Sequence, residues 1–251
     1  MELRGRVALV TGAAHRVGRA LALALAERGM RLALHYHSSE SDARDSARAA
    51  EAASGGAEVW PVHADLQQPD AAERLVHDVA AHFGTIDVLV NSAAIMVRAP
   101  LDEVTPEQWD STFALNLRAP FFCARAAAQV MRSGGGGGEG PRGAIVNIAD
   151  LAGLESWPGY IPHGISKAGV IHMTRSLARV LAPDIRVNAI APGAVLLPES
   201  WSPEDAERLA RTTPLRRVGS PADVSQALLY LLEADYVTGE TIVVDGGRHV
   251  R

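Results

Sequence analysis

The stretch "VALVTGAAHRVGRALALALAERG", residues 7–29, joins an apolar run to a long Ala- and Leu-rich pattern through a turn that contains glycine. The pattern predicts a buried strand over 6–12 and a helix over 18–28. Gly12 leaves the strand, and Gly18 lies where the helix is expected to begin. Small residues there let backbone N–H groups approach a pyrophosphate at the positive end of the helix. The alternative is a tight strand–helix turn without a ligand.

The same alternation continues to the end of the chain. Further strands are expected at 31–37, 57–65, 86–93, 143–150, 185–193 and 241–247. Further helices are expected at 40–53, 69–82, 106–132, 163–181 and 221–233. Several strand runs lack polar alternation, as parallel strands buried on both faces do. The order predicts a doubly wound α/β fold, in which helices flank both faces of a seven-stranded parallel sheet.

Composition narrows the class of protein. The chain has 251 residues, 47% of them hydrophobic, and a net charge of -5, which suits a single domain over 1–251. No basic surface for nucleic acid and no polybasic membrane patch is expected. No signal peptide or transmembrane run is recognised, so a cytoplasmic location is expected. The single cysteine, Cys123, lies in an apolar helical pattern and is expected to be a buried structural thiol.

Two segments depart from the alternation. The glycine-rich segment 133–143 is expected to be a flexible surface loop. The segment 194–214 is expected to form a loop and a short helix. Its Pro and Trp content suits a lid over a site, and a plain surface excursion is the alternative.

The end of the second strand bears on cofactor choice. Sheets that bind NAD usually place an acid there to hold the ribose 2′-hydroxyl. Here the sequence "HYHSS", residues 35–39, precedes the first acid, Glu40. Serine hydroxyls, backbone amides and imidazoles can donate to a 2′-phosphate, with Arg16 near them in the glycine turn. The pattern favours NADP(H) over NAD(H), and the alternative is that the histidines are simply solvated.

Polar residues also end the third and fourth strands. Asp65 stands in "HADL" and Asn91 in "LVNSAA". Ligands collect at the carboxyl ends of strands in open α/β sheets. Ordinary turn chemistry is the alternative for both residues.

Together these motifs resemble the short-chain dehydrogenase/reductase family over essentially the whole chain. The resemblance is carried by "TGAAHRVG", "HADL", "DVLVNSAA", "ALNLRAPFF", "RVNAIAPG" and "VTGETIVVDGG". Arg16 replaces the middle glycine of the family's turn. This Arg, the "HYH" and Ser at the second strand and the ending "DGGRHVR" resemble pteridine and dihydromonapterin reductases.

The resemblance implies an NADP(H)-binding enzyme that acts on a small molecule, most often as a homotetramer. It implies a substrate role for Arg16 and Met96. The cofactor contacts that it implies are Gly12, His15, Arg16, Val17, Gly18, Tyr36, His37, Ser38, Asp65, Leu66, Asn91, Ser92, Ala93, Lys167, Pro192 and Gly193.

The resemblance also implies a catalytic set of Asn116, Asp150 and Lys167, with Asp150 in the pteridine-reductase form. His163 stands where the family has Tyr. Pro162 suits a first helical turn, so His163 lies near a helix N-terminus, with Lys167 on its face. The helix dipole and the ammonium favour a neutral imidazole, which can donate a hydrogen bond to a carbonyl or imine.

Four assignments of the proton donor stay open. They are His163, Tyr160 folded over the pocket from outside the helix, Asp150 through water, and loss of redox catalysis. The leading function is an NADPH-dependent reductase that passes hydride to a carbonyl or a pterin-like C=N. The alternatives are a non-catalytic NADP(H)-binding protein, which acts as a sensor or partner subunit, and a 3-oxoacyl-type ketoreductase.

Overall fold

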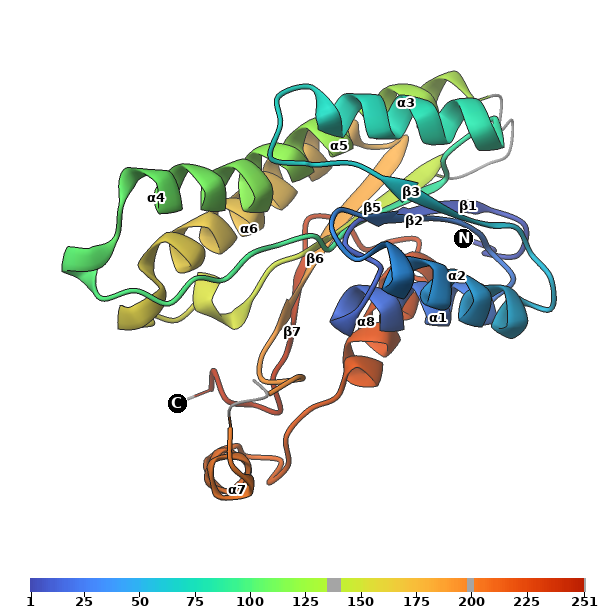
Figure 1. The fold of residues 1–251 in the computed structure, drawn as a ribbon. Coiled ribbons are helices and arrows are strands. Elements are labelled where there is room, and N and C mark those ends of the chain that lie inside the picture. Colours follow the sequence, from blue (N-terminus) through green and yellow to red (C-terminus); the bar gives the residue numbers. More distant parts are fainter. Residues whose placement is uncertain (135–140, 198–200, 251) are drawn as a thin grey trace.

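The computed structural model describes residues 1–134, 141–197 and 201–250 (Figure 1). Seven parallel strands form one sheet in the order β3-β2-β1-β4-β5-β6-β7, which confirms the expected fold class. The strands are β1 (Val7–Val10), β2 (Arg31–Tyr36), β3 (Val59–His63), β4 (Val88–Asn91), β5 (Gly143–Ile148), β6 (Ile185–Pro192) and β7 (Thr241–Val244). Because β1 pairs with both β2 and β4, the strand order reverses at β1, and a crevice opens there at the carboxyl ends of the strands.

Helices cover both faces of the sheet (Figure 1). Helices α3, α5 and α6 lie on one face, and α4 extends beyond the sheet beside α6, whereas α1, α2 and α8 lie on the other face. Helix α7 stands apart from both layers, near the C-terminal end of the chain. The helices are α1 (Arg16–Glu27), α2 (Glu40–Ser54), α3 (Ala71–Phe83), α4 (Pro106–Phe113), α5 (Ala119–Ser133), α6 (Ile161–Leu181), α7 (Pro203–Thr212) and α8 (Pro221–Glu233). Short 3-10 turns span Leu101–Glu103, Leu151–Gly153 and Pro158–Tyr160.

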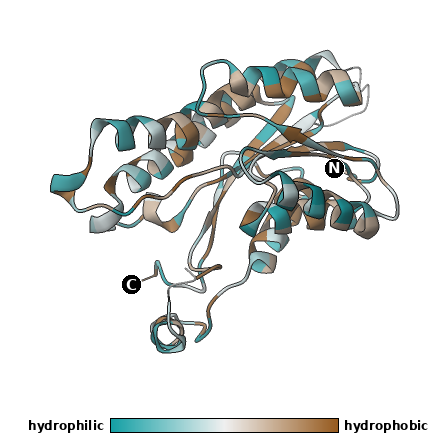
Figure 2. Cartoon of the chain, in the orientation of Figure 1, coloured by the Kyte–Doolittle hydropathy of each residue, from teal (hydrophilic) through white to brown (hydrophobic). Residues whose placement is uncertain are grey.

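The sheet is buried on both faces, as its apolar strands predict. In β1, Val7 and Leu9 belong to the apolar cluster under α3 and α5, and Ala8 and Val10 belong to the cluster under α1 and α8. Figure 2 shows hydrophobic strands between helices whose outer faces are hydrophilic. Cys123 is fully buried in the first of these clusters, and burial raises the pKa of its thiol to about 12, so the expected structural thiol is confirmed.

Three helices begin with the same local device, complete in two of them. A hydroxyl residue accepts a hydrogen bond from the third helical N–H, and the side chain at that third position bonds back to the backbone N–H of the hydroxyl residue. A proline follows the hydroxyl residue in each case, where its fixed φ suits a first turn. Both bonds are made by Thr105 with Gln108 and by Ser202 with Asp205, whereas Ser220 with Asp223 makes only the second, at 2.7 Å.

The helix expected over 106–132 is interrupted, which corrects that prediction. A π turn over Ala114–Arg118 separates α4 from α5. Pro120 explains it, because proline has no N–H to donate to the carbonyl of Asn116 and its ring crowds that carbonyl. A single π turn within a helix is frequent at functional sites, and this one holds Asn116.

Most other boundaries differ by at most two residues, and β7 ends at Val244, three residues before the expected end of the last strand. Helix α1 begins at Arg16 and α6 begins at Ile161, each two residues earlier than expected. Residues 135–140 of the expected glycine-rich loop and 198–200 of the expected lid lie outside the described residues. Within the described part of the chain, no helix has the length and apolar character to cross a bilayer.

Candidate active site

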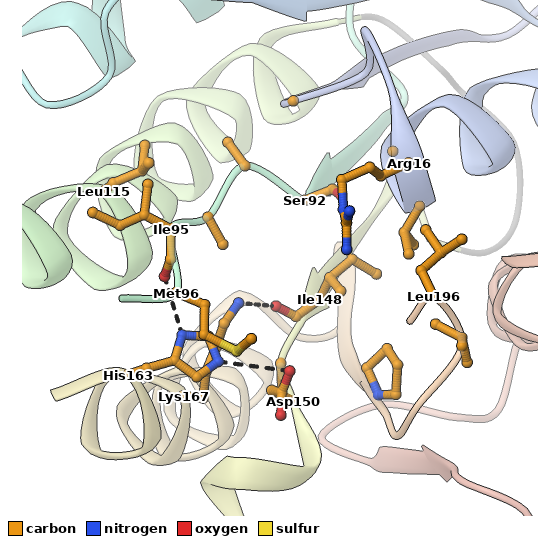
Figure 3. Close-up of a pocket in the computed structure, with 18 of the residues that line it drawn as sticks. Arg16, Ser92, Ile95, Met96, Leu115, Ile148, Asp150, His163, Lys167 and Leu196 are labelled. Atoms are coloured by element: carbon orange, nitrogen blue, oxygen red, sulfur yellow. Dashed lines mark hydrogen bonds and ion pairs between the residues drawn. The ribbon is translucent and has the colours of Figure 1, made fainter. Parts of the chain in front are cut away.

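A cavity of about 800 Å³ occupies the crevice at the carboxyl ends of the strands. Its walls come from the loops that follow β1 to β6, from the start of α6 and from the segment around α7. Figure 3 shows Arg16 on one side of this cavity and Asp150, His163 and Lys167 on another. A volume of this size suits a ligand as large as a dinucleotide together with a small substrate.

The turn after β1 leaves no room for a side chain at Gly12 or Gly18. A Cβ on Gly12, whose φ is +67°, would lie 2.8 Å from the Cα of Ala93. A Cβ on Gly18 would lie 2.1 Å from the carbonyl oxygen of Gly12. The hydroxyl oxygen of Thr11 accepts hydrogen bonds from the N–H groups of Ser92 at 2.9 Å and Ala93 at 3.1 Å, so the turn is tied to the β4 loop. The start of α1 is thereby held open toward the cavity, which fits a phosphate-bearing cofactor.

Arg16 takes the place of a glycine in both sequence and conformation. Its φ is 55°, in the left-handed region that favours glycine. Figure 3 shows its guanidinium pointing into the cavity. The turn therefore keeps the backbone course of a glycine turn and adds a cation to the cavity wall.

No acidic residue stands at the end of β2, where this strand reaches the cavity. Tyr36, His37 and Ser38 line it, as does Ser39. Asp65 approaches from the end of β3, where its carboxylate accepts from the N–H of Gln67 at 3.0 Å and from Gln68 at 2.9 Å. These hydrogen bonds, led by that from Gln68, lower the pKa of Asp65.

His35 differs from the expectation that its imidazole serves a 2′-phosphate. Its Nδ1 accepts from the N–H of Gly12 at 3.0 Å, and its Nε2 donates to the carbonyl oxygen of Ala64 at 3.0 Å. Burial lowers the pKa of the ring to about 4. His35, on β2, is thus neutral and joins the glycine turn after β1 to the loop after β3, with both of its ring nitrogens engaged. The imidazole of His37 also lines the cavity, and its side chain is exposed.

The catalytic candidates come together from two elements. Asp150 follows β5, and its carboxylate accepts from the N–H of Ala152 at 2.7 Å. His163 is the third residue of α6, and its Nε2 lies 3.6 Å from the carboxylate of Asp150 (Figure 3). Lys167, one turn later, is buried, and its ammonium donates to the carbonyl oxygen of Ile148 at 2.7 Å. Burial lowers the pKa of Lys167 to about 8, against the opposing effect of the Asp150 charge.

Asn116 acts behind the cavity wall. Its side-chain oxygen accepts from the N–H of Ile95 at 2.9 Å. Its amide nitrogen donates to the carbonyl of Ile95 at 2.9 Å and to the hydroxyl of Ser166 at 3.1 Å. That hydroxyl donates to the carbonyl of His163 at 2.7 Å. The π turn therefore holds the β4 loop and the start of α6 together.

This network decides which ring nitrogen of His163 carries hydrogen in the neutral state. Nδ1 lies 3.1 Å from the carbonyl oxygen of Ile95, which can only accept. The amide of Asn116 is also 3.4 Å from Nδ1, but its two hydrogens already serve shorter bonds to Ile95 and Ser166. Nδ1 is consequently the protonated nitrogen. Nε2 is buried, and no hydrogen-bond partner is found for it within the described part of the chain.

The structure thus differs from the expectation that the neutral ring of His163 donates a hydrogen bond to the substrate. A neutral His163 presents a lone pair at Nε2 to the cavity, because its one N–H is held by Ile95. To donate, the ring must carry a second proton on Nε2, beside the carboxylate of Asp150. That carboxylate is one-quarter exposed and so reaches water.

Tyr160 also reaches the cavity, from the turn just before α6. Its ring packs edge-on against Trp157, with ring centroids 6.2 Å apart. No hydrogen bond of its hydroxyl is found among the described residues. The structure therefore places a phenol in the cavity wall, without the direct approach to Asp150 that His163 has.

Most of the residues expected from the sequence line this one cavity. Two do not. Asn116 lies behind it, and Asn91 is buried, donating to the side-chain oxygen of Asn147 at 2.9 Å. The Asn91 amide links β4 to β5, and the cofactor contact expected at Asn91 stays a prediction. The two flanking residues expected after Asn91, Ser92 and Ala93, do line the cavity.

Sequence reasoning missed several residues that the fold brings to the site. Ile95 acts through its backbone carbonyl, which leaves no sequence signal, and His35 acts by being buried. Arg248 lines the cavity from the C-terminal segment. The available signal was a cation in the motif "DGGRHVR", three residues past Asp245, which directly follows β7.

Known proteins match this chain over nearly its full length. A family profile described as enoyl-(acyl carrier protein) reductase matches residues 12–249. A 3-oxoacyl-acyl-carrier-protein reductase from Synechocystis is 36% identical, covering 98% of this chain and 97% of its own. A blue fluorescent protein from a metagenomic library, solved with NADPH, has a TM-score of 0.87 at 30% identity, covering 99% of each chain. An acetoin dehydrogenase from Enterobacter cloacae has a TM-score of 0.87 at 34% identity, covering 98% of this chain and 96% of its own. The chain belongs to the short-chain dehydrogenase/reductase family, whose members are oxidoreductases that bind a nicotinamide cofactor.

Proposed function

We propose that the protein is an NADPH-dependent reductase of a carbonyl compound, with His163 as the proton donor and Asp150 as its charge partner. The observation that carries the proposal is the buried Nε2 of His163, which has no hydrogen-bond partner among the described residues and lies 3.6 Å from Asp150, in the cavity that also holds the glycine turn. A buried polar atom without a partner is costly unless a ligand supplies one.

The chain's own residues account for binding and proton handling. The glycine turn and Arg16 would hold the pyrophosphate, Ser38 and His37 the 2′-phosphate, and Lys167 the nicotinamide ribose. When bound, the cofactor supplies the hydride. The doubly protonated ring of His163 gives the Nε2 proton to the carbonyl oxygen as that oxygen gains charge. The ring returns to its neutral form, with Nδ1 still bonded to Ile95, and Asp150 passes a new proton in from water.

Several finer features belong to this proposal. Absence of an acid at the end of β2 supports NADP(H) over NAD(H). Leu196, Leu197, Trp201 and Leu209 line the cavity and support a lid in the single domain. A homotetramer stays a prediction, supported by apolar side chains of α4, α5 and α6 that are roughly two-fifths exposed or more, Trp109, Phe121 and Ile165.

The substrate class rests on two different observations. The 3-oxoacyl relatives favour a ketone, as in a 3-oxoacyl thioester. A pterin-like C=N is the second candidate, because Arg16 points into the cavity and Met96 lines it with half of its surface exposed. Met can cover a flat ring.

The test is NADPH oxidation over 3-oxoacyl thioesters, diketones and dihydropterins, with His163→Ala and the matched control Tyr160→Phe. A general acid contributes about 10²–10⁴-fold in rate. We expect His163→Ala to lose about that much, with little change in NADPH affinity, and Tyr160→Phe to stay near the wild-type rate.

The opposite ranking would make Tyr160 the donor. If wild type binds NADPH but oxidises it with no substrate of the panel, the non-catalytic alternative replaces the reductase. Titration of NADPH into each variant separates loss of chemistry from loss of the fold.

A further inference from the structure

Arg248 enters the cavity from a rigid C-terminal turn. The buried carboxylate of Asp245 accepts from the N–H groups of Gly247 at 2.8 Å and His249 at 2.7 Å, and from the ring of His249 at 2.9 Å. The N–H of Leu215, just past α7, donates to the carbonyl of Gly246 at 3.1 Å. The backbone of Arg248 is therefore fixed from both sides.

The guanidinium of Arg248 has unmet hydrogen-bonding capacity. The residue is half-buried, and its Nε is buried with no partner in residues 1–134, 141–197 and 201–250. In the same ranges, no carboxylate lies within 4.0 Å of it. A half-buried guanidinium with a buried, unpaired Nε and no anion beside it in these ranges suits a ligand that brings an anion.

Other charges around the cavity do not satisfy this need. Its two lining carboxylates have other neighbours: Asp65 accepts from Gln67 and Gln68, and Asp150 accepts from Ala152 and lies 3.6 Å from Nε2 of His163. The other arginines that line it are Arg16, in the glycine turn, and Arg98, which is exposed. Arg248 is therefore a half-buried arginine of the cavity wall, and it lies outside the glycine turn.

Apolar side chains line the same cavity. Leu196, Leu197, Trp201 and Leu209 reach it from the segment between β6 and the end of α7. The turn that carries Arg248 packs against the residues just after α7, since a Cβ on Gly246 would lie 2.8 Å from the side chain of Thr213. A cavity lined by these apolar side chains and by the guanidinium of Arg248 suits a ligand with a short carbon chain and an anionic end.

We propose that Arg248 is a specificity-determining residue that binds an anionic oxygen group, carboxylate or phosphate-type, of the carbonyl substrate. The proposal rests on the proposed function for the reacting carbonyl, but the anion site itself needs no turnover. A planar guanidinium binds such groups through paired hydrogen bonds.

The experiment measures binding by calorimetry, with the protein alone and with saturating NADP⁺, so that no hydride is transferred. The probes are pyruvate, acetoacetate, levulinate and 5-oxohexanoate, each beside its methyl ester. Acetonylphosphonate beside its diethyl ester separates phosphate-type from carboxylate recognition. We expect at least one acid to bind about tenfold or more tightly than its ester.

The variant Arg248→Gln should abolish that ratio, and Arg248→Lys should keep part of it. Arg98→Gln is the matched control, an arginine of the same cavity that is exposed, and it should keep the ratio. Equal binding of every acid and its ester by wild type overturns the proposal, whatever the variants do. So does an unchanged ratio in Arg248→Gln, or an equal loss in Arg98→Gln.

The result separates this site from the proposed function. An Arg248-dependent acid preference without any NADPH oxidation would retain the anion site and reject the reductase. Oxidation of NADPH by neutral ketones alone, with no acid preference, would retain the reductase and reject the anion site.

Discussion

The cavity has two ends that are shaped in different ways, a backbone end at the glycine turn and a side-chain end at the start of α6. At the glycine turn, shape comes from backbone, since Gly12 and Gly18 leave no room for a Cβ. At the start of α6, shape comes from side chains, since Asn116, Asp150 and His163 contact each other or the Ile95 backbone. Backbone geometry tolerates even an arginine at position 16 with its φ of 55°, provided that the course of the chain is kept. A side-chain site changes its chemistry when one residue changes, and the proposed proton transfer depends on His163.

The largest expected effect tests the backbone end. Gly18→Ala would force a Cβ to 2.1 Å from the Gly12 carbonyl oxygen, and backbone cannot move aside as a flexible side chain does. We expect NADPH binding to be lost and the free energy of unfolding to fall by more than about 3 kcal/mol. NADPH titration and urea unfolding measure the two.

Gly134→Ala is the control, because its Cβ would meet nothing closer than 3.5 Å. If Gly18→Ala kept wild-type affinity for NADPH, the contrast between the two ends of the cavity would be wrong.

The second-largest expected effect tests the side-chain end of the cavity, through the influence of the Lys167 pKa on stability. Its pKa is about 8 in the folded protein and 10.5 in the unfolded chain, because of burial. Between those pH values the unfolded chain binds the proton that the folded protein has released, so stability rises with pH. Relative to Lys167→Met, the wild type should gain about 3 kcal/mol in free energy of unfolding across this window. Urea unfolding of both proteins at several pH values measures it, and a constant difference would show that burial does not tune this lysine.

The smallest effect concerns the 2′-phosphate. Ser38→Asp would place a carboxylate in the cavity wall at the end of β2, where a 2′-phosphate is expected. Repulsion should lower the ratio of NADPH to NADH affinity about tenfold or more. Ser41→Asp adds the same charge on α2 at an exposed position outside the cavity lining and should leave the ratio near that of wild type. Titrations of both cofactors at one ionic strength decide it, and equal affinities in the unmodified protein would contradict the NADP(H) preference.

The fold was predictable because its signals are local. Apolar runs such as 143–148 carry the parallel sheet, and a hydroxyl residue followed by proline marks the start of α4, α7 and α8. The break in the helix 106–132 was also local, and the missed signal was Pro120.

The site was only partly predictable because its deciding contacts are distant in sequence. The glycine turn and the residues at positions 150, 163 and 167 could be found from spacing and resemblance. The role of His35 could not, because it depends on burial between Gly12 and Ala64. The tautomer of His163 could not either, because it depends on a backbone carbonyl 68 residues away.

The hydrogen-bonded ring of Asn116, Ile95, His163 and Ser166 has a consequence for substitution at position 163. A tyrosine at position 163 carries one hydroxyl and cannot replace both ring nitrogens, so the Ile95 carbonyl would keep only the bond from Asn116. A His163→Tyr substitution is therefore coupled to the β4 loop and is not an independent change. A phenol placed at position 163 by itself would enter a pocket whose hydrogen bonds are arranged around an imidazole.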